Sequence, residues 1–282
     1  MIFSLEDKIQ TNYTGYNQLS RFYHSCLRHP TPSNFHLAFA DVEWFDGNLS
    51  ALLLAMVYHL NKTYGHTVTT DAEVIKERFD VLYRNGFMNS GIPVYDDRDS
   101  TIPTRAFKTD DKEGFCSYVE NELLTHRGMP DSLTAELKEK INEDLLEVFC
   151  NTHHHANTTA PFFVGGQYYP KQGYLKFTMV DLGDGFLPRI NKATQGAIKS
   201  NRDSILWALA GNSSKKVLDN CPGGLGIKDM LKYCRKSGGV LQIISCDGFW
   251  SSDLENTIFQ KGRVLPTAFI GTTINLFFKK HT

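Results

Sequence analysis

The stretch YLKFTMVDLGDG, residues 174–185, decides the predicted fold together with SLTAELKEKINEDLLEVFCNTHHHA, residues 132–156. In 174–181 apolar and polar side chains alternate, which predicts a half-buried strand with Lys176 and Thr178 on its polar face and Asp181 at its end. The earlier segment predicts a long helix, because apolar side chains recur every three or four residues at Leu133, Leu137, Ile141, Leu145 and Val148. A long helix beside an alternating strand indicates an α/β fold.

The elements after Asp181 continue this pattern. Residues 203–211 and 224–239 are expected to be helices that end at glycines, and residues 240–246 and 273–278 are expected to be strands.

The N-terminal part predicts a separate, small α/β module. We expect a strand at 35–42, then a helix at 48–64 with Asn48 as its N-cap and Gly65 at its end. A strand at 66–69 and a helix at 71–87 follow. Residues 89–114 hold two prolines and ten charged residues without a sustained period, so they indicate a connection. We therefore expect two domains, 1–110 and 111–282.

Composition and charge exclude several classes of protein. Thirty basic and 31 acidic residues give a net charge of −1, so the total charge does not indicate nucleic acid or an anionic membrane as a partner. The six cysteines are scattered and none forms a C-x-x-C pair, which favours reduced thiols in a cytoplasmic protein. The apolar run at 51–58 is too short to span a membrane, and the N-terminus does not resemble a signal peptide.

Two sets of polar residues are candidates for chemistry. Glu147, Asn151 and His155 are four residues apart and line one stripe of the long helix, although a solvated outer face has the same spacing. Asp181 ends the strand, and its carboxylate could accept a hydrogen bond from an exocyclic amine. Gly183 and Gly185 follow it and let the backbone turn sharply toward a ligand. An ordinary turn remains the alternative there.

Glycine-rich segments supply a second kind of candidate. The run Gly223-Gly224-Leu225-Gly226 opens a helix, where free backbone N–H groups and the helix dipole favour phosphate. Upstream, Ser213, Ser214 and Lys215 add hydroxyls and an ammonium group, and Gly271-Thr272 opens the last strand with another hydroxyl.

In this order the motifs resemble the GHKL superfamily of ATPases, which includes gyrase, the heat-shock 90 chaperone, histidine kinases and the mismatch-repair ATPases. The resemblance covers about residues 115–280. The E-x-x-x-N box matches Glu147 and Asn151, with His155 four residues further on. The D-x-G-x-G box matches residues 181–185, the glycine-rich box matches 223–226, and the late Gly-Thr matches 271–272. The resemblance implies a Bergerat-type α/β sandwich with helices over a mixed sheet, and a lid at about 186–222.

The resemblance also implies a role for each residue. Asn151 would hold Mg²⁺ against the phosphates of ATP, Asp181 would accept from the adenine amino group, and residues 223–226 would wrap the phosphates. Glu147 could orient or deprotonate an attacking water, which favours hydrolysis, or transfer to a hydroxyl, over transfer to histidine. The run His153-His154-His155 could indicate zinc, but successive helical residues point about 100° apart and cannot chelate one ion together.

The N-terminal segment FADVEWFDGNLSALL, residues 39–53, is similar to the strand, loop and helix of STAS domains. Those domains carry a phosphorylated serine at the helix start, and here the matching run Asp46-Gly47-Asn48-Leu49 lacks that hydroxyl. The pairing of a STAS-like front with a GHKL-like back resembles an architecture of bacteria that is associated with phage defence.

Three functions follow from these resemblances as hypotheses. The first is a slowly hydrolysing Mg-ATP switch whose ordered lid is read by a partner protein or effector subunit, a second copy of the chain included. The second is a serine or threonine protein kinase of the anti-sigma type that acts on another protein. The third is a scaffold that binds nucleotide without catalysis, against which Glu147 argues.

Overall fold

The computed structural model describes residues 1–89, 92, 94–155, 158–212 and 226–280, without the side chains of residues 153–155. The N-terminal elements are β1 (Ile2–Ser4), β2 (Asp7–Ile9), α1 (Tyr13–Leu27), β3 (Asn34–Ala38), β4 (Val42–Phe45), η1 (Gly47–Leu49), α2 (Ser50–Tyr64), β5 (Thr67–Thr70), α3 (Ala72–Arg78), α4 (Val81–Arg84) and η2 (Phe87–Asn89). The later elements are β6 (Thr101–Phe107), α5 (Lys112–Tyr118), η3 (Val119–Leu123), α6 (Ala135–His155), β7 (Phe162–Tyr169), β8 (Tyr174–Asp181), α7 (Leu187–Ala193), α8 (Asn201–Leu209), α9 (Gly226–Ser237), β9 (Val240–Ser245), β10 (Gly248–Ser251), η4 (Ser252–Leu254), β11 (Arg263–Val264) and β12 (Thr272–Lys279).

A seven-stranded sheet forms the centre of the molecule, with strand order β11-β10-β9-β12-β8-β7-β6. Every neighbouring pair of its described strands is antiparallel, so the expected mixed sheet is wrong. The reason is local, because β7 and β8 and then β9 and β10 are joined by short hairpins, and β12 runs antiparallel to both of its neighbours. Two small parallel sheets, β1-β3-β5 and β2-β4, belong to the N-terminal part.

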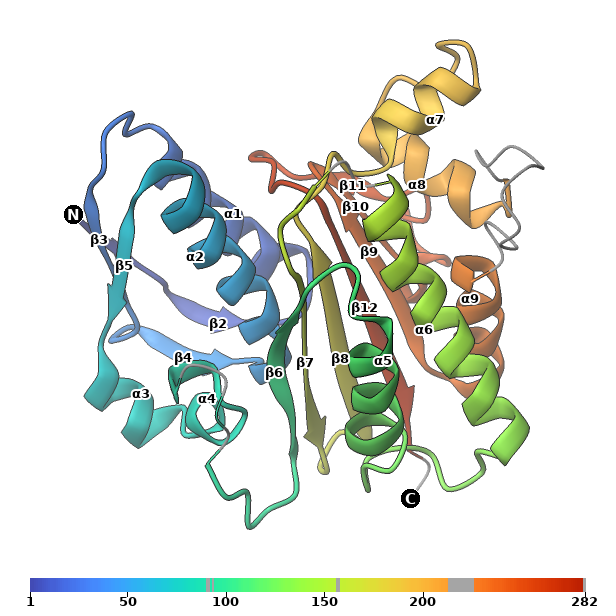
Figure 1. Ribbon diagram of the computed structural model, residues 1–282, viewed down its shortest axis with the longest axis horizontal. Helices are drawn as coiled ribbons and strands as arrows, with labels where there is room; N and C mark the ends of the chain where they lie inside the picture. Colours follow the sequence, from blue (N-terminus) through green and yellow to red (C-terminus); the bar gives the residue numbers. More distant parts are fainter. Residues whose placement is uncertain (90–91, 93, 156–157, 213–225, 281–282) are drawn as a thin grey trace.

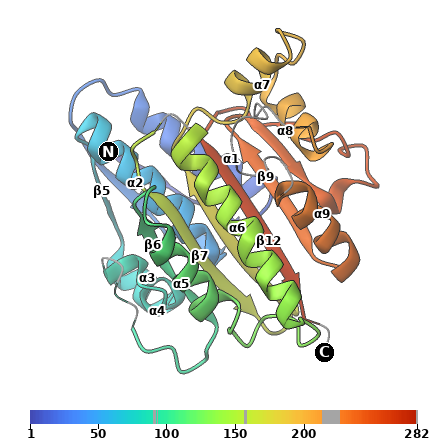
Figure 2. The same cartoon turned by 45° about the vertical axis from the view of Figure 1, so that its right-hand side comes forward.

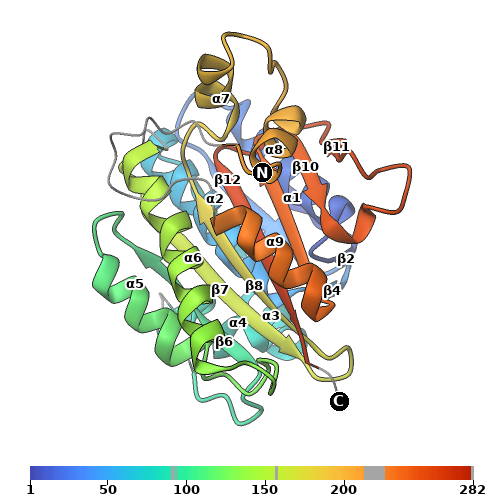
Figure 3. The ribbon, with the colours of Figure 1, turned by 90° about the vertical axis from the view of Figure 1, so that its right-hand side faces the viewer.

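Helices cover both faces of the large sheet, which confirms the α/β class (Figure 1). On one face of the sheet, α5, α6 and α9 lie side by side and cover the strands (Figure 3). Their apolar side chains form one core with alternate residues of β8, namely Leu175, Phe177 and Met179. The same core includes Ile141, Leu145 and Val148, so the predicted apolar stripe of the long helix is confirmed. Figure 2 shows α6 running along the strands.

The other face of the sheet is covered by α1 and α2 of the N-terminal part (Figure 1). Lys176 and Thr178 lie on this face and are buried, so the expectation of a half-exposed strand is wrong. The pattern could not show this, because the layer that covers them comes from residues more than a hundred positions earlier in the chain.

Polar contacts join the two layers. Lys176 Nζ donates to Asp46 Oδ2 at 2.7 Å, and both side chains are buried. Asn48 Nδ2 donates to Thr178 Oγ1 at 2.7 Å, and Thr178 Oγ1 donates to Asn275 Oδ1 at 2.7 Å. The expected N-cap role of Asn48 is therefore wrong, since its side chain bonds to the sheet while α2 begins after the short η1 turn.

The remaining N-terminal expectations are largely confirmed. Helix α2 ends at Gly65, whose φ of 68° is the left-handed conformation typical of a glycine C-cap. The strand expected at 35–42 is divided into β3 and β4, and the helix expected at 71–87 into α3 and α4.

The described part of the segment 89–114 is more regular than its composition indicated. It contains β6, an edge strand of the large sheet, so its interpretation as a plain connection is wrong. The pairing of β6 with β7 carries a register shift between Ile102 and Arg105, around Pro103, and this irregularity hides the strand period in the sequence. The division into domains 1–110 and 111–282 stays a prediction. Across the described ranges, no helix has both the length and the apolar character needed to cross a membrane.

Candidate functional site

The candidate residues collect at one end of the large sheet. The last residue of β8 is Asp181, the first residue of β12 is Thr272, and the two are partners across the ladder. The C-terminal end of α6 lies at the same end of the sheet (Figure 1). Antiparallel pairing of β8 with β12 thus brings together two motifs that are 91 positions apart in the sequence.

Asp181 is a carboxyl whose burial and hydrogen bonds have opposite effects on its pKa. Its Oδ1 accepts a hydrogen bond from the Gly183 N–H at 2.8 Å. Burial raises the pKa of Asp181 to about 6, although hydrogen bonds from Gly183 and Thr272 act in the opposite direction. Near neutral pH the carboxyl of Asp181 is therefore mainly ionised, and it can accept a hydrogen bond from an amine of a ligand. Burial makes the ionised carboxylate unfavourable, and a hydrogen bond from such an amine would offset that effect.

Two glycines give the backbone at this end its shape. Gly271 has a φ of 84°, and a Cβ there would lie 2.0 Å from the Asp181 carbonyl oxygen, so only glycine fits against β8. Gly185 has a φ of 72°, and a Cβ there would meet Ser245 Oγ at 2.7 Å and Cys246 Sγ at 2.9 Å. The sharp turn expected at 181–185 is present, and its role at a ligand stays a prediction.

Ser245 and Cys246 belong to the site and were not found from the sequence. Ser245 Oγ accepts from the Phe186 N–H at 2.9 Å, and the Cys246 N–H donates to the Gly271 carbonyl at 3.0 Å. They lie where β9 ends beside β12. The strand order alone brings them to Asp181, and no local pattern in the sequence signals it.

Glu147 does not lie on a solvated helix face. It is half-buried, and its Oε2 accepts from the Gly226 N–H, the first of α9, at 2.9 Å. The carboxylate therefore contacts the helix start that the sequence assigned to phosphate. This contact joins two of the four predicted motifs.

Asn151 lies one turn after Glu147 on α6 and is half-buried. Its amide oxygen is a hard donor of the kind that Mg²⁺ accepts. Helix α6 includes His155, but that side chain lies outside the described residues. The predicted ligand residues Ser213, Ser214, Lys215, Gly223, Gly224 and Leu225 also lie outside the part of the chain that the structure describes.

Asp144 is a buried acid on α6 that sequence reasoning missed. Lys140 Nζ approaches its Oδ1 at 2.9 Å, yet burial raises the pKa of Asp144 to about 6. A signal was available, because Asp144 follows Ile141 by three residues and precedes Val148 by four, which places it on the apolar stripe.

We expect the Asp144→Asn variant to be more stable than the wild type above about pH 6, by up to about 3 kcal/mol. A raised pKa means that the folded protein binds this proton more tightly than the unfolded chain, so stability falls as pH rises from about 4 to about 6. The difference should vanish below about pH 3, where the carboxyl is protonated in both states. Urea unfolding at several pH values measures it, with exposed Glu143→Gln as the control. A difference independent of pH would contradict the assignment.

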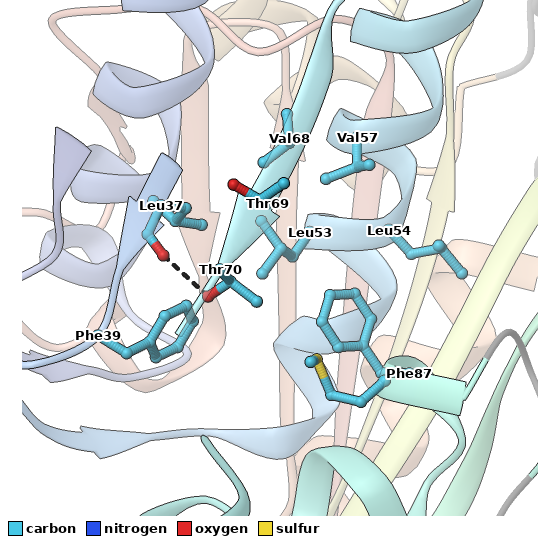
Figure 4. A pocket seen from close by; sticks show the side chains of 10 residues that line it. Leu37, Phe39, Leu53, Leu54, Val57, Val68, Thr69, Thr70 and Phe87 are labelled. Atoms are coloured by element: carbon cyan, nitrogen blue, oxygen red, sulfur yellow. Dashed lines mark hydrogen bonds between the residues drawn. The ribbon is translucent and has the colours of Figure 1, made fainter. Parts of the chain in front are cut away.

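A separate cavity of about 330 Å³ lies in the N-terminal part, away from Asp181. Apolar side chains of β3, α2 and η2 line it together with β5 (Figure 4). Thr70 turns its hydroxyl to the Leu37 carbonyl, with Oγ1 and O 2.8 Å apart. This cavity has no polar group in common with the candidate site.

Comparison with known proteins gives no match, either to a protein-family model or to a curated protein. The function proposed below therefore rests on the residues and the geometry of this chain.

Proposed function

We propose that the protein binds Mg-ATP at the end of β8 and β12, hydrolyses it slowly, and acts as a nucleotide-dependent switch on a partner protein. The observation that carries the proposal is the joining of separate motifs. Asp181 and Thr272 are ladder partners, and Glu147 on α6 contacts the first N–H of α9. This adjacency supports the proposal, because the resemblance to GHKL ATPases implies that these motifs surround one nucleotide.

Each residue of the proposed site contacts a different part of Mg-ATP. Asp181 accepts from the adenine amino group, and Thr272 and the Gly183 turn fix its carboxyl. The start of α9 directs N–H groups at phosphate oxygens. Asn151 supplies a protein oxygen to Mg²⁺, and the bound ion would neutralise the phosphate charge.

Glu147 is the proposed group that orients or deprotonates water. Its Oε2 accepts from the Gly226 N–H, so a phosphate that binds at this N–H would have to displace the carboxylate. A carboxylate displaced by phosphate stays next to the reacting group, because α6 and α9 pack together.

A protein kinase acting on another chain is the second candidate. The same site serves it, because a carboxylate that activates water can also activate a hydroxyl. The discriminating measurement uses ATP labelled at the γ-phosphate: label released as inorganic phosphate supports hydrolysis, and label retained on a protein supports the kinase. Both candidate functions need a partner protein on which the chain acts, and a second copy of this chain is one candidate for it.

We expect Asp181→Asn to reduce the preference for ATP over GTP by at least about tenfold, the value of one hydrogen bond to a charged group. The carboxylate accepts from adenine N6 but repels guanine O6, whereas the amide can donate to O6. Competition binding with ATP and GTP near pH 7.5 measures the preference, and exposed Asp184→Asn is the control. An unchanged preference in Asp181→Asn would contradict the assigned role.

A further inference from the structure

A second group of reactive side chains lies on the small sheet β1-β3-β5, on the opposite side of α2 from β8 and β12 (Figure 1). Phe35 and Leu37 of β3 are buried in the core, so His36 between them is on the outer face. Thr69 of β5 is the ladder partner of His36 and is exposed. The function proposed above uses none of these residues.

The outer face holds a hydroxyl, an imidazole and a carboxylate in series. His36 Nδ1 lies 3.1 Å from Thr69 Oγ1, and His36 Nε2 lies 2.7 Å from Asp71 Oδ1. An ionised carboxylate can only accept, so in the neutral imidazole the ring proton is on Nε2 and Nδ1 presents its lone pair to the hydroxyl. A hydroxyl next to a base that a third group orients is the general arrangement of an activated nucleophile.

The carboxylate of Asp71 bonds to His36 and does not cap the start of α3. Asp71 occupies the N-cap position of α3 but makes no side-chain capping bond, although aspartate is a preferred cap. Its Oδ2 accepts from the Phe39 N–H at 2.8 Å instead. That hydrogen bond, and the one from His36, hold the pKa of Asp71 below its usual value. Asp71 thus stays ionised and fixed against the imidazole.

The edge of the sheet offers backbone donors next to Thr69. Among the described strands β5 pairs only with β3. The Thr67 N–H donates to the Ser33 carbonyl, so the alternation of a parallel ladder turns the Thr70 N–H away from β3 and toward the open edge. A donor directly after the nucleophile can stabilise the oxyanion of an acyl-transfer intermediate.

We infer that Thr69, His36 and Asp71 form an acyl-accepting site for small activated esters. Thr69 Oγ1 attacks the ester carbonyl and its proton passes to His36 Nδ1. The tetrahedral intermediate then expels the alcohol or phenol, which takes that proton, and an acyl ester remains on Thr69. Water releases the acyl group as a carboxylic acid by the same proton transfers. Thr69 and His36 act as catalytic residues, and Asp71 is a positioning residue.

The surroundings of His36 favour an ester with an apolar acyl group. Ile2, the ladder partner of His36 on β1, is 76% exposed and offers an apolar surface beside the imidazole. The Thr69 hydroxyl also lies 3.3 Å from the Phe35 carbonyl, which competes for its proton, so we expect an activated leaving group to be necessary.

The test exposes the full chain to p-nitrophenyl acetate and maps acetyl groups by peptide mass spectrometry. We expect acetylation at Thr69, its loss in Thr69→Val, and about a hundredfold slower acetylation of Thr69 in His36→Gln. Thr67→Val is the matched control, because Thr67 is exposed on the same strand and face but opposes Asn34. It should leave acetylation of Thr69 unchanged.

Other outcomes overturn the proposal. Equal acetylation of Thr67 and Thr69, or Thr69 acetylation that is unchanged in His36→Gln, would show an ordinary surface hydroxyl. Asp71→Asn should slow the reaction and Asp71→Glu should restore part of it, whereas full activity in Asp71→Asn would remove the positioning role. Thermal unfolding of each variant verifies that it is folded.

Discussion

Replacing Asp46 by alanine is expected to lower the free energy of unfolding by about 3–5 kcal/mol, because it leaves the buried ammonium of Lys176 without its carboxylate. Asp46 also accepts from the Thr11 N–H at 2.7 Å and from Trp44 Nε1 at 2.8 Å. Burial raises the pKa of Asp46, but Lys176 and these donors outweigh it and keep the pKa below its usual value. The carboxylate is therefore charged in the folded protein and stabilises the contact between the two layers.

A double-mutant cycle separates the ion pair from simple loss of packing. Asp46→Ala combined with Lys176→Met should recover part of the loss, since the unpaired charge is gone. The exposed pair Lys8–Glu43, whose Nζ and Oε2 are 3.9 Å apart, is the control, and Lys8→Ala should change stability by less than about 1 kcal/mol. Strictly additive losses for Asp46 and Lys176, measured by urea unfolding, would show that the two side chains do not stabilise each other.

Asn151→Ala and Glu147→Gln should affect the proposed ATP site in different ways. Loss of the Asn151 amide removes the one protein ligand proposed for Mg²⁺, so Mg-dependent ATP affinity should fall by about a hundredfold or more. Glu147→Gln should keep affinity within about threefold and reduce turnover by about 10²- to 10⁴-fold, the contribution of a general base. Calorimetry and phosphate release measure the two quantities.

Glu143→Gln is the matched control, because Glu143 lies one turn earlier on α6 and is exposed. It should leave both affinity and turnover unchanged. Equal loss of affinity in Asn151→Ala and Glu147→Gln would contradict the division of roles.

The elements with a local cause were predictable from the sequence. The apolar stripe of α6, helix α2 with its glycine end, and the strand that ends on Asp181 all depend on neighbours within a few residues. The burial of Lys176, Thr178 and Asn48 was not predictable, because each is covered by a layer from the other part of the chain. Strand β6 escaped notice because a register shift near Pro103 interrupts its alternation.

The sequence predicted single residues of the candidate site but not all the residues that lie together there. The sequence identified Asp181, Thr272 and Glu147, and antiparallel pairing and helix packing account for their contacts. Ser245 and Cys246 enter only through the strand order, so for them the missing information was which distant segment lies next to each residue. Asp144 differs, because its place on the apolar stripe of α6 already indicated its burial.

Isothermal titration of the full chain with ATP, in the presence and absence of Mg²⁺, measures the proposed binding itself. We expect one saturable site in the presence of Mg²⁺, with much weaker binding of ATP when the ion is chelated and weaker binding of Mg-GTP. Absence of saturable Mg-ATP binding to the folded wild-type chain would contradict it.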